Sequence, residues 1–151
     1  MRHEYISDVD VKNCLMDIIR QMYMDGFKPD VVVGLVRGGM VPANLISQFL
    51  DIPCYMINKD ESTHILPSGK NILVIDDIND TGKTFTDISN YFTFEYEANF
   101  KYASLISNVG SNFEVDYYSV EINSLEEEIW IVFPWENWWM SISDDDLQRI
   151  P

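Results

Sequence analysis

Residues 74–84 read VIDDINDTGKT, and this stretch indicates the fold class of the chain. Its first residues end an apolar run, residues 72–75, with the length and β-branched content of a buried strand. Three acids and a Thr-Gly-Lys-Thr segment follow, and a helix is then expected over residues 84–94. A buried strand that leads through a polar turn into a helix is half of a βαβ unit, which predicts a parallel sheet.

The sequence on both sides repeats this alternation of apolar runs and helical patterns. The expected elements are helices over residues 7–25 and 42–50, strands over residues 30–36, 54–57, 102–107, 116–120 and 129–133, and a polar loop over residues 58–71. Residues 137–151 are aromatic and then acidic, which favours a packed segment followed by a short helix or tail. The chain is therefore predicted to be an α/β domain with a mostly parallel central sheet flanked by helices.

Composition narrows the possible partners. The chain has 151 residues and a formal net charge of −15, which fits one domain and disfavours binding to nucleic acid or to anionic membranes. No apolar stretch is long enough to span a bilayer, and the N-terminal residues lack the apolar core of a signal peptide. We expect a cytoplasmic protein. Cys14 and Cys54 are too few for a disulfide framework and are expected to be reduced.

Three readings compete for the acid-rich turn. In the first, Asp80 or Thr81 simply caps the following helix, which leaves two acids unexplained. In the second, the turn is a P-loop, but that pattern requires glycine where Asp77 stands. In the third, Asp76 and Asp77 accept hydrogen bonds from vicinal hydroxyls, while residues 81–84 hold a phosphate on backbone amides. A sugar phosphate accounts for the whole stretch.

The same stretch resembles the binding motif of type I phosphoribosyltransferases. Two further stretches carry the resemblance: VRGG at residues 36–39 is similar to the pyrophosphate loop of that family, and IWIVFPWE at residues 129–136 resembles the C-terminal hood of small bacterial xanthine-guanine and hypoxanthine phosphoribosyltransferases and their archaeal and phage relatives. The resemblance implies the type I phosphoribosyltransferase fold in a single domain, residues 1–151, with a core over about residues 7–122 and a hood over about residues 123–151.

The resemblance also implies a substrate, phosphoribosyl pyrophosphate (PRPP), and a set of residues that bind it. The 5-phosphate would lie on Thr81, Gly82, Lys83 and Thr84, the ribose hydroxyls on Asp76 and Asp77, and the pyrophosphate on Arg37 and Gly38. The Val36–Arg37 peptide bond would be cis. Mg²⁺ would bridge substrate oxygens with help from Asp77, and would offset the repulsion between an acidic protein and a polyanion.

The remaining implied roles concern the nucleobase. Asp80 would take a proton from the base as the new bond forms, and Trp130 and Ile131 would line the base. Asn108 would also bind the base, because it stands where the purine enzymes have a lysine that reads the base, and a neutral amide can donate or accept.

Two functions are thus open. The first is Mg²⁺-dependent transfer of phosphoribosyl from PRPP to a base, most plainly guanine, xanthine or hypoxanthine, with release of pyrophosphate. The second is a regulatory protein of the same fold that binds PRPP or nucleotide without catalysis. The resemblance implies a homodimer or higher homo-oligomer.

Overall fold

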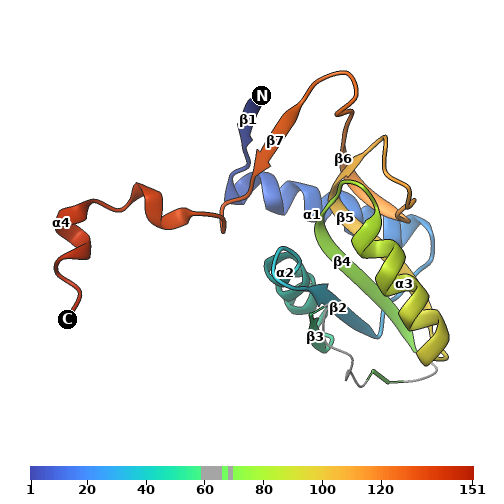
Figure 1. The fold of residues 1–151 in the computed structure, drawn as a ribbon. Helices are drawn as coiled ribbons and strands as arrows, with labels where there is room; N and C mark the ends of the chain where they lie inside the picture. Colours follow the sequence, from blue (N-terminus) through green and yellow to red (C-terminus); the bar gives the residue numbers. More distant parts are fainter. Residues whose placement is uncertain (59–65, 68–69) are drawn as a thin grey trace.

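A five-stranded parallel sheet forms the centre of the protein. The computed structural model describes residues 1–58, 66–67 and 70–151. The strand order is β3-β2-β4-β5-β6, and every neighbouring pair is parallel (Figure 1). The strands are β2 (Val31–Leu35), β3 (Cys54–Ile57), β4 (Asn71–Asn79), β5 (Asn99–Asn108) and β6 (Tyr117–Ile122). The α/β class expected from the sequence is confirmed.

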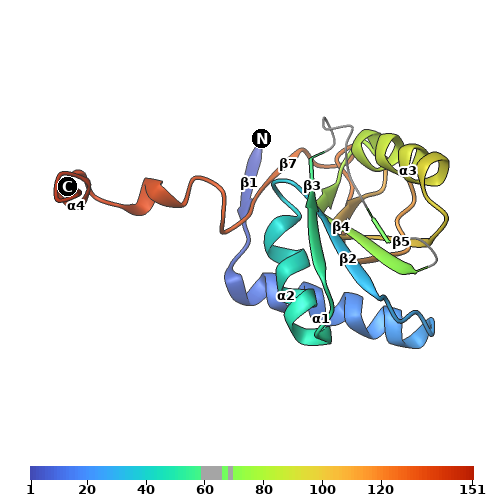
Figure 2. The same ribbon diagram turned by 90° about the horizontal axis from the view of Figure 1, so that it is seen from below.

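Helices cover both faces of this sheet, as the fully buried central strands require. On one face lie α1 (Asp8–Met24) and α2 (Met40–Leu50), and on the other lies α3 (Lys83–Glu95) (Figure 2). Helix α1 begins at a capping box, in which Ser7 and Asp10 bond to each other's backbone amides. Its apolar stripe is buried against the sheet, and α3 buries three side chains on the opposite face, Phe85, Ile88 and Phe92.

Strand β4 is longer than the run of apolar residues that predicted it. It extends beyond Ile75 to Asn79, because Asp76, Ile78 and Asn79 continue the pairing with β5. The two acids expected in a turn therefore lie within the strand, and the turn itself is reduced to residues 80–82. The sheet pairing overrides the low strand propensity of aspartate here.

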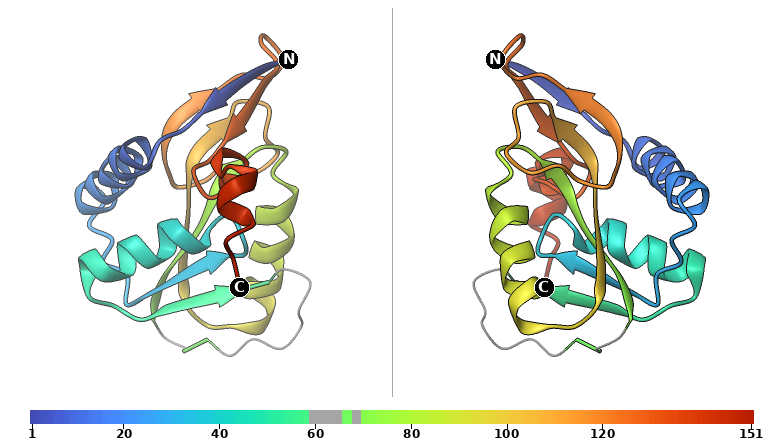
Figure 3. Two further views of the ribbon diagram at one scale, coloured as in Figure 1. Left: turned by 90° about the vertical axis from the view of Figure 1, so that its left-hand side faces the viewer. Right: turned by 90° about the vertical axis from the view of Figure 1, so that its right-hand side faces the viewer.

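A second, two-stranded sheet stands beside the central one. Strand β1 (Arg2–Tyr5) pairs in parallel with β7 (Ile129–Val132), so the N-terminal strand lies beside the last strand of the chain (Figure 3). The register places His3 opposite Trp130. All four residues of β1 are exposed, which explains why no apolar pattern predicted this strand.

The last residues form an arm that leaves the body of the molecule. We call residues 137–151 the C-terminal arm; it contains a 3-10 turn, η1 (Trp138–Ser141), and a short helix, α4 (Asp144–Leu147) (Figure 1). Trp138 is 60% exposed, Trp139 49% and Met140 78%. The short helix was expected, but the packed aromatic segment was not correct, because these rings do not reach the core.

Two sequence expectations concern the rest of the chain. Most of the loop expected over residues 58–71 lies outside the described residues, and Asn71 already belongs to β4. Within the described part of the chain, the longest apolar helical stretch falls short of what is needed to cross a membrane.

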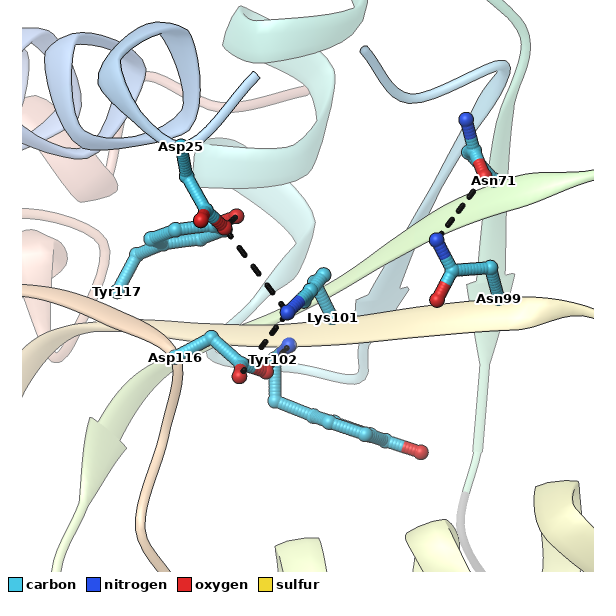
Figure 4. A network of polar contacts seen from close by, with 7 residues as sticks. All are labelled: Asp25, Asn71, Asn99, Lys101, Tyr102, Asp116 and Tyr117. Atoms are coloured by element: carbon cyan, nitrogen blue, oxygen red, sulfur yellow. Dashed lines mark hydrogen bonds and ion pairs between the residues drawn. The ribbon is translucent and has the colours of Figure 1, made fainter. Parts of the chain in front are cut away.

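A polar network fastens the sheet edge to α1, far from the acid-rich turn. Lys101 Nζ lies 3.9 Å from Asp25 Oδ2 and 3.8 Å from Asp116 Oδ1, and the Tyr117 hydroxyl donates to Asp25 at 2.5 Å (Figure 4). Burial, and then the hydrogen bond to Asp25, raise the pKa of Tyr117. These contacts hold the C-terminal end of α1 against the beginnings of β5 and β6.

Candidate active site

The ends of β2 and β4 approach each other closely where the two predicted motifs meet. A Cβ atom built on Gly38 would lie only 2.2 Å from Asp77 Oδ2, so the backbone after β2 passes directly over this carboxylate. The Val36–Arg37 peptide bond is cis, as predicted. The Asp77 carboxylate also accepts a bond from the Ile78 amide at 2.7 Å. The pyrophosphate-loop motif and the acidic motif are therefore side by side.

A small cavity lies at the turn between β4 and α3. It has a volume of about 180 Å³ and is lined by consecutive residues from Asp76 to Phe85, among them every residue of the acidic motif predicted to bind PRPP. Gly82 has a φ of 90°, and a Cβ atom there would lie 2.6 Å from the Phe113 amide nitrogen. Only glycine fits this conformation and this close approach.

The residues that follow β5 hold this turn in place through hydrogen bonds. The Asn112 amide donates to the Thr81 carbonyl at 2.9 Å. Asn79, which is buried, donates to the Phe113 carbonyl at 2.8 Å and accepts from the Ser111 hydroxyl at 2.9 Å. Sequence reasoning missed these supporting residues. The turn around Gly82 is thus fixed by hydrogen bonds from another part of the chain.

The first turn of α3 is available to an anion. The N-cap residue is Gly82, which has no side chain, and Thr81 Oγ1 accepts a hydrogen bond from the Lys83 amide at 3.3 Å. Neither Asp80 nor Thr81 is thus the N-cap residue, and a cap alone would leave Asp76 and Asp77 unexplained. The remaining amides of the first turn and the positive end of the helix dipole favour a bound anion here. The Lys83 side chain instead pairs with Asp87 at 2.8 Å, which raises the lysine pKa.

A larger cavity of about 800 Å³ adjoins the small one. The two share Asp77, Ile78, Asp80 and Thr81. The large cavity is also lined by the end of β5, the loops on either side of β6, β7 and the residues that follow β7, including Asn108, Ser124, Trp130, Ile131, Phe133 and Glu136. All three predicted base-binding residues, Asn108, Trp130 and Ile131, thus face one space with Asp80. Trp130 is 55% exposed, so its ring is open to a ligand.

Asn108 is tied into the protein on every side of its carboxamide. Its nitrogen donates to Asp80 Oδ1 at 2.9 Å and to Ser124 Oγ at 2.8 Å. Its oxygen accepts from the backbone amides of Gly110 and Ser124, each at 3.3 Å. Asn108 is 7% exposed. This side chain connects the acidic motif with the loop between β6 and β7.

Asp77 lies in an environment that opposes its ionised form. Burial raises the pKa of Asp77, and the negative charge of Glu136 raises it further, while the interaction with the Asp76 side chain and the hydrogen bond from the Ile78 amide act in the opposite direction. Sequence reasoning gave Glu136 no role, although it ends the hood-like stretch at residues 129–136. A carboxylate pair that faces one cavity is suited to a divalent cation.

Arg37, which was predicted to bind pyrophosphate, lies apart from the other predicted site residues of the two cavities. This side chain is exposed and lines neither of the two cavities, although Gly38 next to it contacts Asp77.

No cluster of three or more acidic, histidine or cysteine side chains that could hold a metal occurs among the described residues. Mg²⁺ commonly takes one or two carboxylates and completes its shell with substrate phosphates and water, so Asp77 and Glu136 fit such an ion.

Comparisons with known proteins identify the family to which the chain belongs. No family model matches the chain. It is 28% identical over 134 residues to the xanthine-guanine phosphoribosyltransferase of Cereibacter sphaeroides, covering 75% of each chain. It is 30% identical over 120 residues to the enzyme of the same name from Desulfotalea psychrophila, covering 70% of this chain and 69% of that one.

A solved structure extends the likeness over nearly the whole chain. The crystal structure of a purine phosphoribosyltransferase from Pyrococcus horikoshii matches with a TM-score of 0.77 and 29% identity, covering 91% of this chain and 96% of that one. The parallel sheet with helices on both faces agrees with these likenesses. The chain belongs to the xanthine-guanine phosphoribosyltransferase family.

Proposed function

We propose that this protein transfers the 5-phosphoribosyl group of PRPP to a purine base, giving a nucleoside 5-monophosphate and pyrophosphate. The observation that carries the proposal is that the two cavities meet at Asp77, Asp80 and Thr81. The small cavity lies at the turn before α3, where an anion is favoured, and the large cavity has apolar and aromatic walls. A sugar phosphate with a flat base fills both spaces. The reaction matches the names of the relatives.

PRPP would bind along the ends of β2 and β4. Its 5-phosphate would accept hydrogen bonds from the amides of residues 81–84, where α3 begins. The vicinal hydroxyls would donate to Asp76 and Asp77. The pyrophosphate would meet Arg37 and the Gly38 amide, because Gly38 lies directly against Asp77.

Mg²⁺ would be held by Asp77, with Glu136 as its neighbour. The bound cation would neutralise substrate phosphate charge and stabilise the leaving pyrophosphate. The raised pKa of Asp77 supports this role, because a cation relieves the unfavourable charge of both carboxylates. Asp77 must be ionised to bind the ion, so the affinity for Mg²⁺ should fall as the pH is lowered.

The chemistry would proceed as a displacement at C1 of the ribose. The bond between C1 and the pyrophosphate oxygen breaks, and the pyrophosphate leaves with the electron pair. The base nitrogen N9 forms the new bond to C1, and the proton on N7 passes to Asp80. Asp80 lies in both cavities, which suits a base that accepts a proton beside the ribose. Arg37 would oppose the charge that develops on the leaving group.

The test is a survey of bases. The protein is incubated with PRPP, Mg²⁺ and, separately, guanine, xanthine, hypoxanthine, adenine and uracil, and nucleotide formation is followed by chromatography. We expect product with at least one oxopurine and an equal amount of pyrophosphate. Absence of product with all five, together with calorimetric binding of PRPP, would support the regulatory alternative instead.

We also propose that two copies of the chain associate through the C-terminal arm. Its exposed Trp138, Trp139 and Met140 form the kind of aromatic surface that protein interfaces bury. Light scattering on a sizing column should give a dimer or larger species. The variants Trp138→Glu and Trp139→Glu should shift it towards the monomer, whereas Phe94→Glu, which replaces an even more exposed aromatic on α3, should not. Unchanged mass in both tryptophan variants would refute this interface.

We further propose that the protein works in the cytoplasm and without nucleic acid or membrane partners. Cys14 and Cys54 are free thiols, which favours a reducing compartment such as the cytoplasm. The formal net charge of −15 disfavours nucleic acid and anionic membranes as partners.

A further inference from the structure

The Asn108 carboxamide fixes the direction of a hydroxyl group in the large cavity. Its orientation is unambiguous, because its oxygen meets two backbone amides, those of Gly110 and Ser124, which can only donate. The nitrogen must therefore face the Asp80 carboxylate and the Ser124 hydroxyl oxygen. Asn108 has no hydrogen-bonding group left over for a ligand.

This arrangement leaves Ser124 as a donor. Because Ser124 Oγ accepts from Asn108 at 2.8 Å, its own hydrogen points elsewhere. Within the described part of the chain, the Ser124 hydroxyl donates to no other group. Ser124 lines the large cavity and is exposed, so its hydrogen can be offered to a ligand there.

Asp80 and the Ser124 hydroxyl both accept from the NH₂ group of Asn108, so they lie next to each other. Towards the cavity, Asp80 presents an acceptor and Ser124 presents its hydroxyl hydrogen as a donor. The N7 edge of a 6-oxopurine in its N7–H form presents the complement: a donor at N7 beside an acceptor at O6. Adenine presents an amino donor at position 6, which would face the Ser124 hydrogen unfavourably.

We propose that Ser124, oriented by Asn108, reads the 6-oxo group of the base and makes the protein select 6-oxopurines over 6-aminopurines. Asn108 is then a positioning residue that serves both Asp80 and Ser124 and does not itself touch the base. The inference rests on the proposed transfer reaction, and it names the residues that would set the base preference of that site.

The first test compares two bases in the transfer assay. Ser124→Ala should lower kcat/KM for hypoxanthine about tenfold or more, the usual effect of losing one substrate hydrogen bond, and should leave adenine unchanged or improved. Ser124→Thr, which keeps the hydroxyl, should restore the preference. Ser119→Ala, a serine on β6 that bonds to Asp17, serves as the matched control.

A double-mutant cycle tests the role of Asn108. If Asn108 acts through Ser124 and Asp80, then Asn108→Ala should lower kcat and weaken the base preference, and adding Ser124→Ala should reduce the remaining preference far less than it does alone. Full additivity of the two substitutions would show that Asn108 acts on the base independently.

A binding measurement separates this proposal from the proposed reaction. Calorimetry with inosine and adenosine 5-monophosphates requires no turnover, and the wild type should bind the oxo nucleotide more tightly. Ser124→Ala should narrow that gap, even if no base supports transfer. An unchanged ratio of the two affinities in Ser124→Ala would overturn the proposal, whereas absent transfer with the expected binding would overturn only the enzymatic function.

Discussion

Gly38 and Gly39 are neighbours in sequence, yet their replacement by alanine should have opposite kinds of effect. At Gly39, a Cβ atom would lie 2.3 Å from the Ile75 carbonyl oxygen and 2.7 Å from the Leu35 nitrogen, both of them backbone atoms of central strands. At Gly38, the nearest atoms belong to the Asp77 carboxylate, at 2.2 to 2.6 Å. A strand cannot move away cheaply, whereas a side chain can rotate.

The magnitudes follow from these contacts. Overpacking costs about 1–3 kcal/mol, and with backbone atoms on two strands we take the upper end for Gly39→Ala. Alanine also restricts the unfolded chain more than glycine does, which stabilises the folded state by about 0.4–1 kcal/mol. The free energy of unfolding of Gly39→Ala should therefore fall by about 2 kcal/mol. In a domain of this size, that corresponds to about 4–8 °C in Tm. For Gly38→Ala, the same gain offsets the rotation of Asp77, and Tm should change by less than about 2 °C.

Ligand binding should show the reverse order. Rotation of Asp77 removes one carboxylate contact to Mg²⁺ or ribose, so Gly38→Ala should weaken Mg²⁺-dependent binding of PRPP about tenfold, equivalent to about 1.4 kcal/mol. Thermal unfolding and calorimetric titration of both variants provide the assay. Wild-type affinity in a folded Gly38→Ala protein would refute the placement of Asp77 in the site, and a wild-type Tm for Gly39→Ala would refute the close packing.

Three further substitutions test the turn at Gly82, the environment of Asp77 and the hydrogen bond between Tyr117 and Asp25. Gly82→Ala should cost about 1–3 kcal/mol and weaken phosphate binding, because φ is 90° and the added Cβ would meet the Phe113 amide; a wild-type Tm and affinity would contradict this. Asp77→Asn should raise Tm without ligand at pH 7: the folded-state pKa is raised, so stability falls as the pH rises through the interval above 3.8, and asparagine removes that cost. This gain should shrink as the pH is lowered, and a constant gain would be evidence against a raised pKa. Tyr117→Phe should lower the free energy of unfolding by about 1 kcal/mol through loss of the bond to Asp25, as measured by urea unfolding; no change would mean that this bond contributes nothing.

The sequence predicted those elements whose burial follows a simple pattern. Helix α1 has both a capping box and an apolar stripe, and β2 is a β-branched run that is buried throughout, so local rules were sufficient for both. Strand β1 has neither signal, because its exposed residues are held only by pairing with β7. The packing predicted for the C-terminal arm was wrong, because aromatic composition does not distinguish a core segment from an exposed one.

The candidate site shows the same division. The anion turn and its adjacent acids could be predicted, because consecutive residues build them. The bonds from Asn108 to Asp80 and Ser124 could not, because they join parts of the chain that are 28 and 16 residues apart. Asn108 had been expected to read the base itself, and its engaged carboxamide instead suggests an indirect role. Glu136 likewise becomes a candidate only through its proximity to Asp77 in space.

The most direct test of the central claim is the effect of Asp80→Asn on transfer and on binding. Asparagine keeps the size of the side chain and can still accept the bond from Asn108, but it cannot take the proton from the base. Nucleotide formation from PRPP and hypoxanthine should therefore fall by a factor of about 100 or more, while calorimetric binding of PRPP with Mg²⁺ stays close to that of the wild type. Undiminished nucleotide formation by the Asp80→Asn variant would contradict the proposed chemistry of this site.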